Sequence, residues 1–338
     1  MSASKSKKHK ISLYFRAKGA DYSIERVFDS IIPKFDLNLS VSQVYVPHYL
    51  IRFTYILQNL IHCKNNKSEV NHITGVIHYC AFILPYSKTI ITIHDLISVE
   101  HGKGLKKIIF WFFFFYLPLK KCKYVTCISE SVRDSLIKYK CCPASKIIVI
   151  PNPVSDSFVH FPTVFNQEFP QILHIGTRPN KNLDSVIKAL IDIPCHLVII
   201  GEIGTSEQIL LKENRIKYTN KKNLSDDEIL KEYIDCDIVS FPSLYEGFGV
   251  PIIEGQAIGR PILTSNISPM KEVAGENYYL INPYDVRAIA KGFKDLIHNS
   301  ELRSNLIAEG LLNVKKYNSD SIANMYMELY SKILNSKT

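Results

Sequence analysis

The chain has 338 residues, of which 46% are hydrophobic and 22% are charged. This composition is that of an ordinary globular protein and excludes wholesale disorder, and the length suits about two domains of roughly 100–200 residues each. Lysine and arginine exceed aspartate and glutamate by 41 − 32 = 9. The excess favours an anionic partner, which leaves nucleic acid, an anionic membrane face and a phosphorylated ligand open.

The first half of the chain alternates short β-rich runs with amphipathic or apolar stretches, which is typical of parallel α/β layers. Strands are predicted over 11–15, 69–73, 89–93, 124–128 and 147–150, and helices over 22–31 and 131–139. A Pro-Asn-Pro run at 151–153 then opens a polar and aromatic stretch that reaches residue 170. Because prolines disfavour helix on both sides, this stretch is the predicted interdomain linker.

One segment raises the question of a membrane. Residues 108–119 read IIFWFFFFYLPL, and the lysine pairs Lys106-Lys107 and Lys120-Lys121 flank them. A helix of this length covers about 18 Å, less than the roughly 30 Å of a bilayer's hydrocarbon core, so we do not expect a transmembrane helix. The segment either lies in the membrane interface with its lysines at anionic headgroups, or it is a buried helix between solvated lysines.

The second half shows the same alternation. Its predicted strands are 171–175, 196–200, 215–219, 237–241 and 261–264, with helices over 183–191, 226–236 and 251–258. Beyond residue 284 the pattern is helical, over 286–298, 302–315 and 321–334. We therefore predict an α/β fold with domains at 1–152 and 153–318, and a C-terminal helix at 319–338 that could return to the first domain. Ligands of such sheets bind beyond the carboxyl ends of the strands.

Cysteine usage and the N-terminus bear on the compartment. None of the eight cysteines forms a C-x-x-C pair or a zinc-finger spacing with histidine, so we expect small buried side chains in a reducing cytosol. The basic N-terminus is followed by no apolar run, so no secretory signal is predicted. A cytoplasmic protein is expected.

The strongest chemical signal is the run EGFGVPIIE at 246–254. Gly247 and Gly249 remove side chains where a ligand could approach backbone N–H groups, and Pro251 suits the first residue of a helix. The N-terminus of that helix adds partial positive charge. Glu246 would lie just ahead of the helix and Glu254 one turn inside it, so both could face a polyhydroxylated, phosphorylated ligand.

In the longer stretch FPSLYEGFGVPIIEGQA at 241–257, the two glutamates resemble the E-x7-E motif of retaining glycosyltransferase family 4. The resemblance implies the GT-B architecture, in which two Rossmann-like domains face each other across a cleft and the C-terminal one binds the nucleotide sugar. It further implies that Glu254 holds the ribose hydroxyls. Glu246 and the backbone of Gly247, Phe248, Gly249 and Val250 would then position the donor sugar.

A second match is HIGTRPNKNL at 174–183, between a predicted strand and a predicted helix, where a loop can cradle phosphate. It is similar to the family's G-T-x-x-x-K-N-L loop, whose basic residues hold the donor diphosphate. The resemblance assigns Lys181 and Arg178 to the diphosphate, with Gly176 and Thr177 in the same loop. Thr177 stands where many relatives have an arginine.

The N-terminal half carries two further matches. The run TIHD at 92–95 resembles the family's T-x-H-D, whose histidine lies near the donor sugar, so His94 is a candidate to bind a sugar hydroxyl or move a proton. After the first strand, similar enzymes have a glycine loop that admits the diphosphate and the acceptor. Gly19 is the glycine of that loop here, followed by Ala20 instead of a second glycine.

The resemblance predicts an anomer-retaining hexosyltransferase that uses a nucleotide diphosphate sugar as substrate. The expected acceptor is a glycan, lipid-linked and made for surface polysaccharide, and the expected partner is an anionic membrane on the inner face of the cell. No metal or other cofactor is expected, because no D-x-D motif stands at a strand end and Asp226-Asp227-Glu228 are predicted to open a helix after Ser225. A sugar-nucleotide 2-epimerase on the same scaffold is the alternative. A phosphorylase would be longer, and a nucleic-acid-binding protein would show a motif that this chain lacks.

Overall fold

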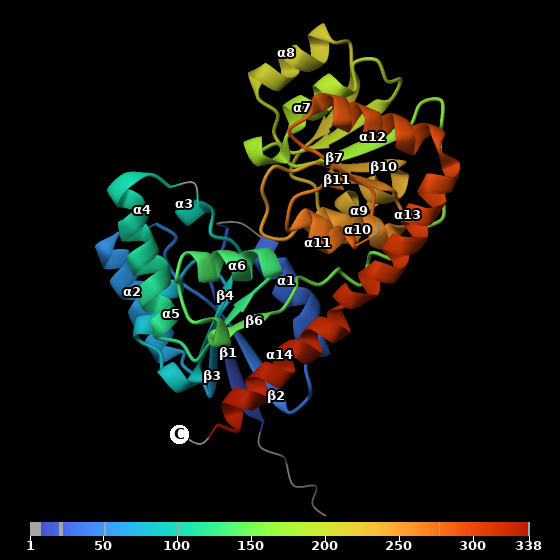
Figure 1. The fold of residues 1–338 in the computed structure, drawn as a ribbon. Coiled ribbons are helices and arrows are strands. Elements are labelled where there is room, and N and C mark those ends of the chain that lie inside the picture. The colour runs from blue at the N-terminus through green and yellow to red at the C-terminus, as the bar shows by residue number, and fades with distance from the viewer. Residues whose placement is uncertain (1–7, 20–22, 51, 101, 277, 337–338) are drawn as a thin grey trace, which may run out of the picture. The chain divides into compact units, whose positions relative to one another are not determined.

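The structure is a computed structural model that describes residues 8–19, 23–50, 52–100, 102–276 and 278–336. It divides into two compact units. Unit 1 is drawn from residues 1–153 together with 319–338, and unit 2 from residues 154–318. Each unit is a parallel six-stranded sheet covered by helices (Figure 1). This confirms the predicted α/β fold of two Rossmann-like domains.

The sheet of unit 1 has the strand order β2-β1-β3-β4-β5-β6, and all of its strand pairs are parallel. Its strands are β1 (His9–Phe15), β2 (Leu39–Tyr45), β3 (Val70–Ile73), β4 (Thr89–Ile93), β5 (Tyr124–Cys127) and β6 (Ile147–Val149). The edge strand β2 was not predicted. It pairs along its whole length with β1, but most of its side chains are exposed or half-buried, so it lacks the apolar run by which the other strands were recognised.

The helices of unit 1 surround this sheet. They are α1 (Ser23–Ile31), α2 (Phe53–Asn65), α3 (Ile97–Glu100), α4 (Gly104–Trp111), α5 (Leu117–Lys120), α6 (Glu130–Lys138) and α14 (Ser319–Leu334), with short helices η1 (Ile32–Lys34), η2 (His78–Phe82), η3 (Tyr86–Lys88) and η5 (Ala144–Lys146). The start expected at residue 22 for the first helix lies outside the described residues. Helix α2 was not predicted.

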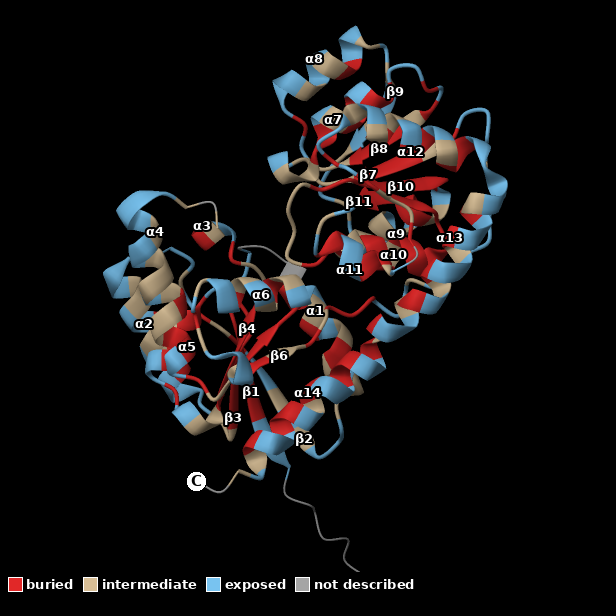
Figure 2. Ribbon diagram, in the orientation of Figure 1, coloured by how far each residue is buried: buried red, intermediate tan, exposed pale blue. Residues whose placement is uncertain are grey.

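The last helix, α14, packs onto the sheet of unit 1 although it follows unit 2 in the sequence. Its Ile322, Tyr326 and Tyr330 are buried in one core with strand β1 and helix α1. Inside that core the Nδ1 atom of His72, on β3, lies 2.8 Å from the hydroxyl of Tyr330. Figure 2 shows the buried face of α14 as a red stripe. Apolar burial on this scale stabilises the return of the chain to unit 1.

The apolar segment 108–119 is not the wholly buried helix of the second alternative, and its place at a membrane interface stays a prediction. Helix α4 continues through a π-helical turn, η4 (Phe112–Tyr116), into α5. Phe115 and Leu119 are buried, whereas Ile108 and Phe113 are exposed. Trp111 is half-buried and its Nε1–H donates to the carbonyl of Tyr139 at 2.9 Å. The segment therefore has one face in the core and one face in solvent.

Unit 2 has the strand order β12-β11-β10-β7-β8-β9, again with parallel pairs throughout. Its strands are β7 (Gln171–Ile175), β8 (His196–Ile200), β9 (Lys217–Lys221), β10 (Ile238–Phe241), β11 (Ile262–Ser265) and β12 (Leu280–Ile281). Strands β7, β8, β10 and β11 are largely buried, which matches the continuous apolar runs by which they were predicted. Strand β9 begins two residues later than predicted, and the two-residue strand β12 was not predicted.

The helices of unit 2 are α7 (Leu183–Ala189), α8 (Thr205–Glu213), α9 (Asp226–Asp235), α10 (Val250–Ile258), α11 (Met270–Ala274), α12 (Val286–His298) and α13 (Ser300–Asn313), with short helices η6 (Pro179–Lys181) and η7 (Val314–Tyr317). Helix α10 begins at Val250, one residue before the start predicted at Pro251.

Two sequence expectations bear on the whole chain. Seven of the eight cysteines are buried and Cys142 is half-buried, and all are free thiols, as expected for small core side chains. Among the described residues, none of the helices combines the length and the apolar character needed to cross a bilayer.

Candidate functional site

The predicted site residues of unit 2 lie at the point where its strand order reverses. Strands β10 and β7 are neighbours at the centre of the sheet, and the chain runs outward from them in opposite directions. In parallel sheets the loops after two such strands diverge and leave a crevice at their carboxyl ends. The loop after β7 carries residues 176–182, and the loop after β10 carries residues 242–249.

Gly176 opens the first loop with a backbone that favours glycine. Its φ is +90°, and a Cβ at this position would lie 2.9 Å from Cγ of Lys181. Asn182 closes the loop in the left-handed region with φ 64°, and its Nδ2–H groups donate to the carbonyls of Pro242 at 3.1 Å and Pro283 at 2.7 Å. The first bond fastens this loop to the loop after β10, and the second fastens it to the segment after β12.

The ammonium of Lys181 forms an ion pair with Glu246. Nζ lies 2.6 Å from Oε1, and the two side chains are 19% and 15% exposed. Nζ also lies 4.7 Å from the ring centroid of Phe241, a cation–π contact. The structure thus brings together two residues that the resemblance assigned to different parts of the donor. A lysine ammonium has three N–H donors, so this pairing leaves it able to bind phosphate oxygens as well.

Asn180, which is not among the predicted site residues, joins the same two loops. Its Nδ2–H groups donate to Oε1 of Glu246 at 3.2 Å and to the carbonyl of Tyr245 at 2.9 Å. The backbone carbonyl of Asn180 accepts from the amide of Leu244 at 2.8 Å. Asn180 therefore fixes the position of the Glu246 carboxylate. Its place in the loop next to Lys181 was the signal in the sequence that could have identified it.

The second loop leads into the N-terminus of α10 through Gly249, whose φ is +114°. The ring of Phe248 is buried, with its centroid 5.6 Å from that of Tyr317. The side chain of Phe248 therefore packs inside unit 2. The predicted contact of Phe248 with the donor would be made by its backbone amide. Gly247 precedes it in the loop and Val250 is the first helical residue, at the positive end of the helix dipole.

Glu254, one turn inside α10, is oriented by a tyrosine from another helix. The hydroxyl of Tyr233, on α9, donates to Oε2 of Glu254 at 2.5 Å. Tyr233 is fully buried, its ring meets Phe158 edge to face, and burial and then the charge of Glu254 raise the pKa of its hydroxyl well above the usual value. The phenol therefore stays a hydrogen-bond donor. No sequence pattern links positions 233 and 254, so this partner could not have been predicted.

The remaining cation and hydroxyl of the first loop lie nearer solvent. Arg178 is exposed, and its carbonyl accepts from the amide of Lys181 at 2.8 Å. The hydroxyl of Thr177 donates to the carbonyl of Glu202 at 2.6 Å. This bond ties the loop after β7 to the loop after β8. Asn220, on β9, also holds the loop after β8, because its Nδ2–H donates to the carbonyl of Gly201 at 2.7 Å.

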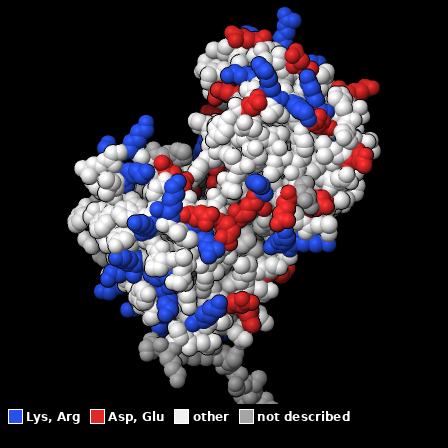
Figure 3. All heavy atoms as spheres, in the orientation of Figure 1, with Lys and Arg blue, Asp and Glu red and all other residues white. Residues whose placement is uncertain are grey.

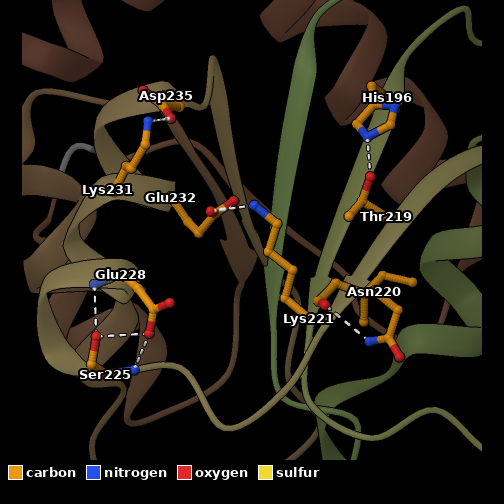
Figure 4. Close-up of polar contacts among 10 residues, drawn as sticks. His196, Thr219, Asn220, Lys221, Ser225, Glu228, Lys231, Glu232 and Asp235 are labelled. Atoms are coloured by element: carbon orange, nitrogen blue, oxygen red, sulfur yellow. Dashed lines mark hydrogen bonds and ion pairs between the residues drawn. The ribbon is translucent and has the colours of Figure 1, made fainter.

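The acidic run after Ser225 opens helix α9, as predicted. The Ser225 hydroxyl accepts from the amide of Glu228, and the Glu228 carboxylate accepts from the amide of Ser225, which is a capping box (Figure 4). In the same view Lys221 reaches across from β9 to the buried carboxylate of Glu232. Among the described residues, no group of three or more His, Cys, Asp or Glu side chains is placed to hold a metal ion.

In unit 1 the predicted His94 lies in the loop after β4. Its Nε2 lies 2.7 Å from the carbonyl of Thr74, which follows β3. A carbonyl can only accept, so Nε2 carries the proton and Nδ1 the lone pair. Burial is the main cause that lowers the pKa of His94 below its usual value, which keeps the ring neutral at pH 7. His94 can therefore accept a hydrogen bond from a hydroxyl.

Gly19, the other candidate of unit 1, lies in an exposed turn after β1 with φ +84°, and a Cβ there would meet nothing within 4 Å. Its neighbour Ala20 lies outside the described residues. Beside this turn the guanidinium of Arg16 pairs with Glu25 of α1 at 3.1 Å, and both side chains are nearly buried. Neither residue of this pair was predicted as part of a site.

Two family models match the chain, and together they cover residues 7–311. The model described as Glycosyltransferase Family 4 matches residues 7–158, and the model described as Glycosyl transferases group 1 matches residues 156–311. The first model ends and the second begins at the junction between the two units.

Three similar proteins are mannosyltransferases. O-antigen chain mannosyltransferase RfbU of Salmonella typhimurium is 27% identical over 70% of this chain and 67% of its own length. Serotype-specific mannosyltransferase WbdA of Escherichia coli is 25% identical over 74% of this chain but only 34% of its own length. O-antigen chain mannosyltransferase B of Escherichia coli is 24% identical over 63% of this chain and 61% of its own length.

Solved structures share the fold over nearly the whole chain. Sucrose-phosphate synthase from Thermosynechococcus elongatus superposes with a TM-score of 0.76 at 14% identity, over 98% of this chain and 100% of that one. HepE of Anabaena in complex with UDP and glucose superposes with a TM-score of 0.75 at 15% identity, over 96% of this chain and 100% of that one.

Proposed function

The chain belongs to glycosyltransferase family 4, and from this premise we propose that it transfers a hexose-type sugar from a nucleotide diphosphate sugar to a glycan acceptor in surface polysaccharide synthesis. Two of the relatives support the proposal, since they are named as O-antigen chain mannosyltransferases. Mannose is the first donor sugar to test, because these relatives are mannosyltransferases.

The observation that carries the proposal is the junction of two loops at the strand reversal of unit 2. Lys181, the Glu246 carboxylate and the N-terminus of α10 meet there. A diphosphate needs cations and backbone N–H groups, and a sugar needs a fixed acceptor for its hydroxyls. We assign the diphosphate to Lys181, Arg178 and the amides at the start of α10, the sugar to Glu246, and the ribose to Glu254.

The proposed reaction retains the configuration of the anomeric carbon. The bond from C1 to the β-phosphate oxygen breaks, and the acceptor oxygen forms its bond to C1 on the same face. The acceptor proton goes to the leaving phosphate oxygen. Lys181 and Arg178 stabilise the charge that develops on the diphosphate. The neutral His94 would accept a hydrogen bond from a sugar hydroxyl at Nδ1, which orients the sugar without adding charge.

We further propose that the acceptor is lipid-linked and that unit 1 meets an anionic membrane through α4. The exposed Ile108 and Phe113, with lysines at both ends of the segment, suit interfacial attachment. Each lysine near an anionic leaflet contributes about 1 kcal/mol. Replacing Lys106, Lys107, Lys120 and Lys121 by serine should weaken binding to anionic vesicles. Equal flotation of the variant and the wild type would contradict this contact.

The proposed function is tested by screening UDP-, GDP-, ADP- and dTDP-sugars for thermal stabilisation. A ligand at 100 times its dissociation constant adds about 2.7 kcal/mol of stability. The donor that stabilises the protein is then supplied with a glycan acceptor, and the anomeric configuration of the product is read by NMR. An inverted product would contradict retention. Turnover of the donor without any acceptor to its 2-epimer would favour the epimerase alternative, and no stabilisation by any donor would contradict the proposal.

A further inference from the structure

Helix α2 of unit 1 exposes an apolar stripe that no part of the proposed function uses. Phe53 is 83% exposed, Leu57 49% and Ile61 51%, and their spacing of four residues places them along one side of the helix. The opposite part of the helix is buried through Asn59 and Cys63. An amphipathic helix of a globular protein normally turns its apolar side inward, so this stripe calls for a partner.

The stripe belongs to the same part of unit 1 as α4. Helix α2 packs on the short helix η2, and so do η4 and α5, which continue α4; α2 and η4 both contact Tyr79 within η2. The Nδ2–H of Asn59 donates to the Tyr79 hydroxyl at 2.8 Å, and the Tyr79 ring lies 6.2 Å from that of Phe114. Further exposed apolar side chains lie on or next to these elements and in the loop before α2, namely Tyr49, Leu50, Phe82, Ile83, Leu105, Ile108, Ile109 and Phe113. We call this set, together with the α2 stripe, the two-helix surface.

The two stretches of sequence that contain α2 and α4 carry charge of one sign. No aspartate or glutamate stands between Asp36 and Glu69, or between Glu100 and Glu130, the two stretches that contain α2 and α4. These stretches hold the exposed cations Arg52, Lys64, Lys67, Lys103, Lys106, Lys120 and Lys121. Figure 3 shows mainly white and blue atoms over the part of unit 1 where α2 and α4 lie in Figure 1.

An anionic lipid surface fits this combination better than a protein partner does. Contacts between proteins are depleted of lysine and enriched in arginine, whereas here lysines surround the apolar side chains. Helix α2 is about 20 Å long, so it is too short to span a bilayer but long enough to lie in the interface plane. Aromatic side chains such as Tyr49 and Phe53 suit the headgroup level.

We propose that α2 is a second membrane-contacting helix, and that it inserts Phe53, Leu57 and Ile61 into the interface of an anionic bilayer beside α4. This inference rests on the membrane contact put forward under the proposed function. Two helices bound to one bilayer fix the orientation of unit 1, because a single helix could rotate about its own axis.

The test is flotation of the full chain with vesicles of phosphatidylcholine alone and of phosphatidylcholine with phosphatidylglycerol. The variant Phe53→Ser/Leu57→Ser/Ile61→Ser removes the stripe and keeps every charge. A matched control, Val159→Ser/Val164→Ser/Leu312→Ser, removes three exposed apolar side chains of unit 2. We expect the stripe variant to lower partition onto anionic vesicles about tenfold or more. The control variant should bind like the wild type.

The outcomes distinguish a failure of the membrane contact of α2 from a failure of the membrane contact of α4. Equal flotation of the stripe variant and the wild type would overturn the role of α2, while loss on replacing the four lysines would still support α4. A wild type that floats with neither vesicle would overturn both membrane contacts, and the donor screen would still test the transferase activity. If the stripe variant instead abolishes self-association in solution and floats normally, the surface joins two copies of the chain. Unchanged donor turnover in solution shows that the variant is folded.

Discussion

The ammonium of Lys181 lies 2.6 Å from Oε1 of Glu246, so the cation assigned to the diphosphate and the carboxylate assigned to the sugar hold each other. Glu246 offsets part of the charge that Lys181 would offer to phosphate. Removal of Lys181 would leave the Glu246 carboxylate without its cation beside the diphosphate. The two residues should therefore depend on each other in nucleotide binding.

Lys181→Ala should raise the Kd for the nucleoside diphosphate about 10- to 150-fold, the range expected for loss of a charge-assisted hydrogen bond. It should hardly change the Kd for the nucleoside alone. Glu246→Gln should leave nucleoside diphosphate binding equal or tighter, since it lifts the competing charge. The double variant Lys181→Ala/Glu246→Gln should recover part of the loss, and strictly additive effects by calorimetry would contradict the coupling.

Asn180 should act on turnover through Glu246. Asn180→Ala removes the donor that holds the Glu246 carboxylate and the Tyr245 carbonyl, so we expect kcat to fall about tenfold with a smaller change in the KM for the donor. Asn180→Asp should be worse than alanine, because it sets a second carboxylate against Glu246. A loss confined to thermal stability, with kcat unchanged, would show that Asn180 only holds the loops together.

Tyr233→Phe should weaken nucleotide binding without disturbing the core, since the ring that packs on Phe158 remains. The variant removes the hydroxyl that donates to Glu254, and loss of such a bond is worth about 1 kcal/mol, or about fivefold in Kd. The affinity for the nucleoside should fall by the same factor as that for the nucleoside diphosphate. Tyr284→Phe, at an exposed position of the same unit, is the control. Equal affinities for both variants would remove the positioning role of Tyr233.

Buried histidines should make the protein lose stability on the acid side of neutrality. Burial lowers the pKa of His72 and His174 to about 3, and that of His78 to about 4. In an unfolded chain a histidine titrates near pH 6.5, so below that pH the unfolded state binds more protons. The contribution of these histidines to the free energy of unfolding is complete above about pH 6.5. It falls as the pH drops towards the pKa values of the folded protein, by at most about 1.4 kcal/mol per histidine and pH unit. Tm measured at pH 7.5, 6.5 and 5.5 should be level at first and then fall; a Tm that stays constant down to pH 5 would refute this.

The central strands and the two site loops of unit 2 could be predicted because their signals are local. Buried parallel strands are continuous apolar runs, and the glycines at 176 and 249 mark backbones that other residues rarely adopt. The edge strand β2 was missed because its side chains are mostly exposed, and β12 because two residues give no pattern. The return of α14 to unit 1 was expected only as a possibility, because it depends on packing against β1, which lies more than 300 residues earlier and leaves no local trace in the sequence.

The contacts that orient the site were largely beyond prediction. Tyr233 and Glu254 come from different helices, and only the packing of α9 beside α10 brings them together. The pairing of Lys181 with Glu246 could not be read from spacing, since both were assigned to ligand atoms. The stripe on α2 was missed together with its helix, since no helix was predicted over 53–65, and the exposure of its apolar side chains becomes visible only in the fold.

The assignment of the donor sugar to Glu246 and of the ribose to Glu254 is the central claim about this site. It is tested by measuring, for Glu246→Ala and Glu254→Ala, both the Kd of the nucleoside diphosphate by calorimetry and the kcat with the donor identified in the screen. We expect Glu254→Ala to raise the Kd about tenfold or more, because the ribose loses its acceptor, and Glu246→Ala to lower kcat while the Kd stays at or below that of the wild type. Two variants that bind the nucleotide and turn over the donor like the wild type would contradict the assignment of this site.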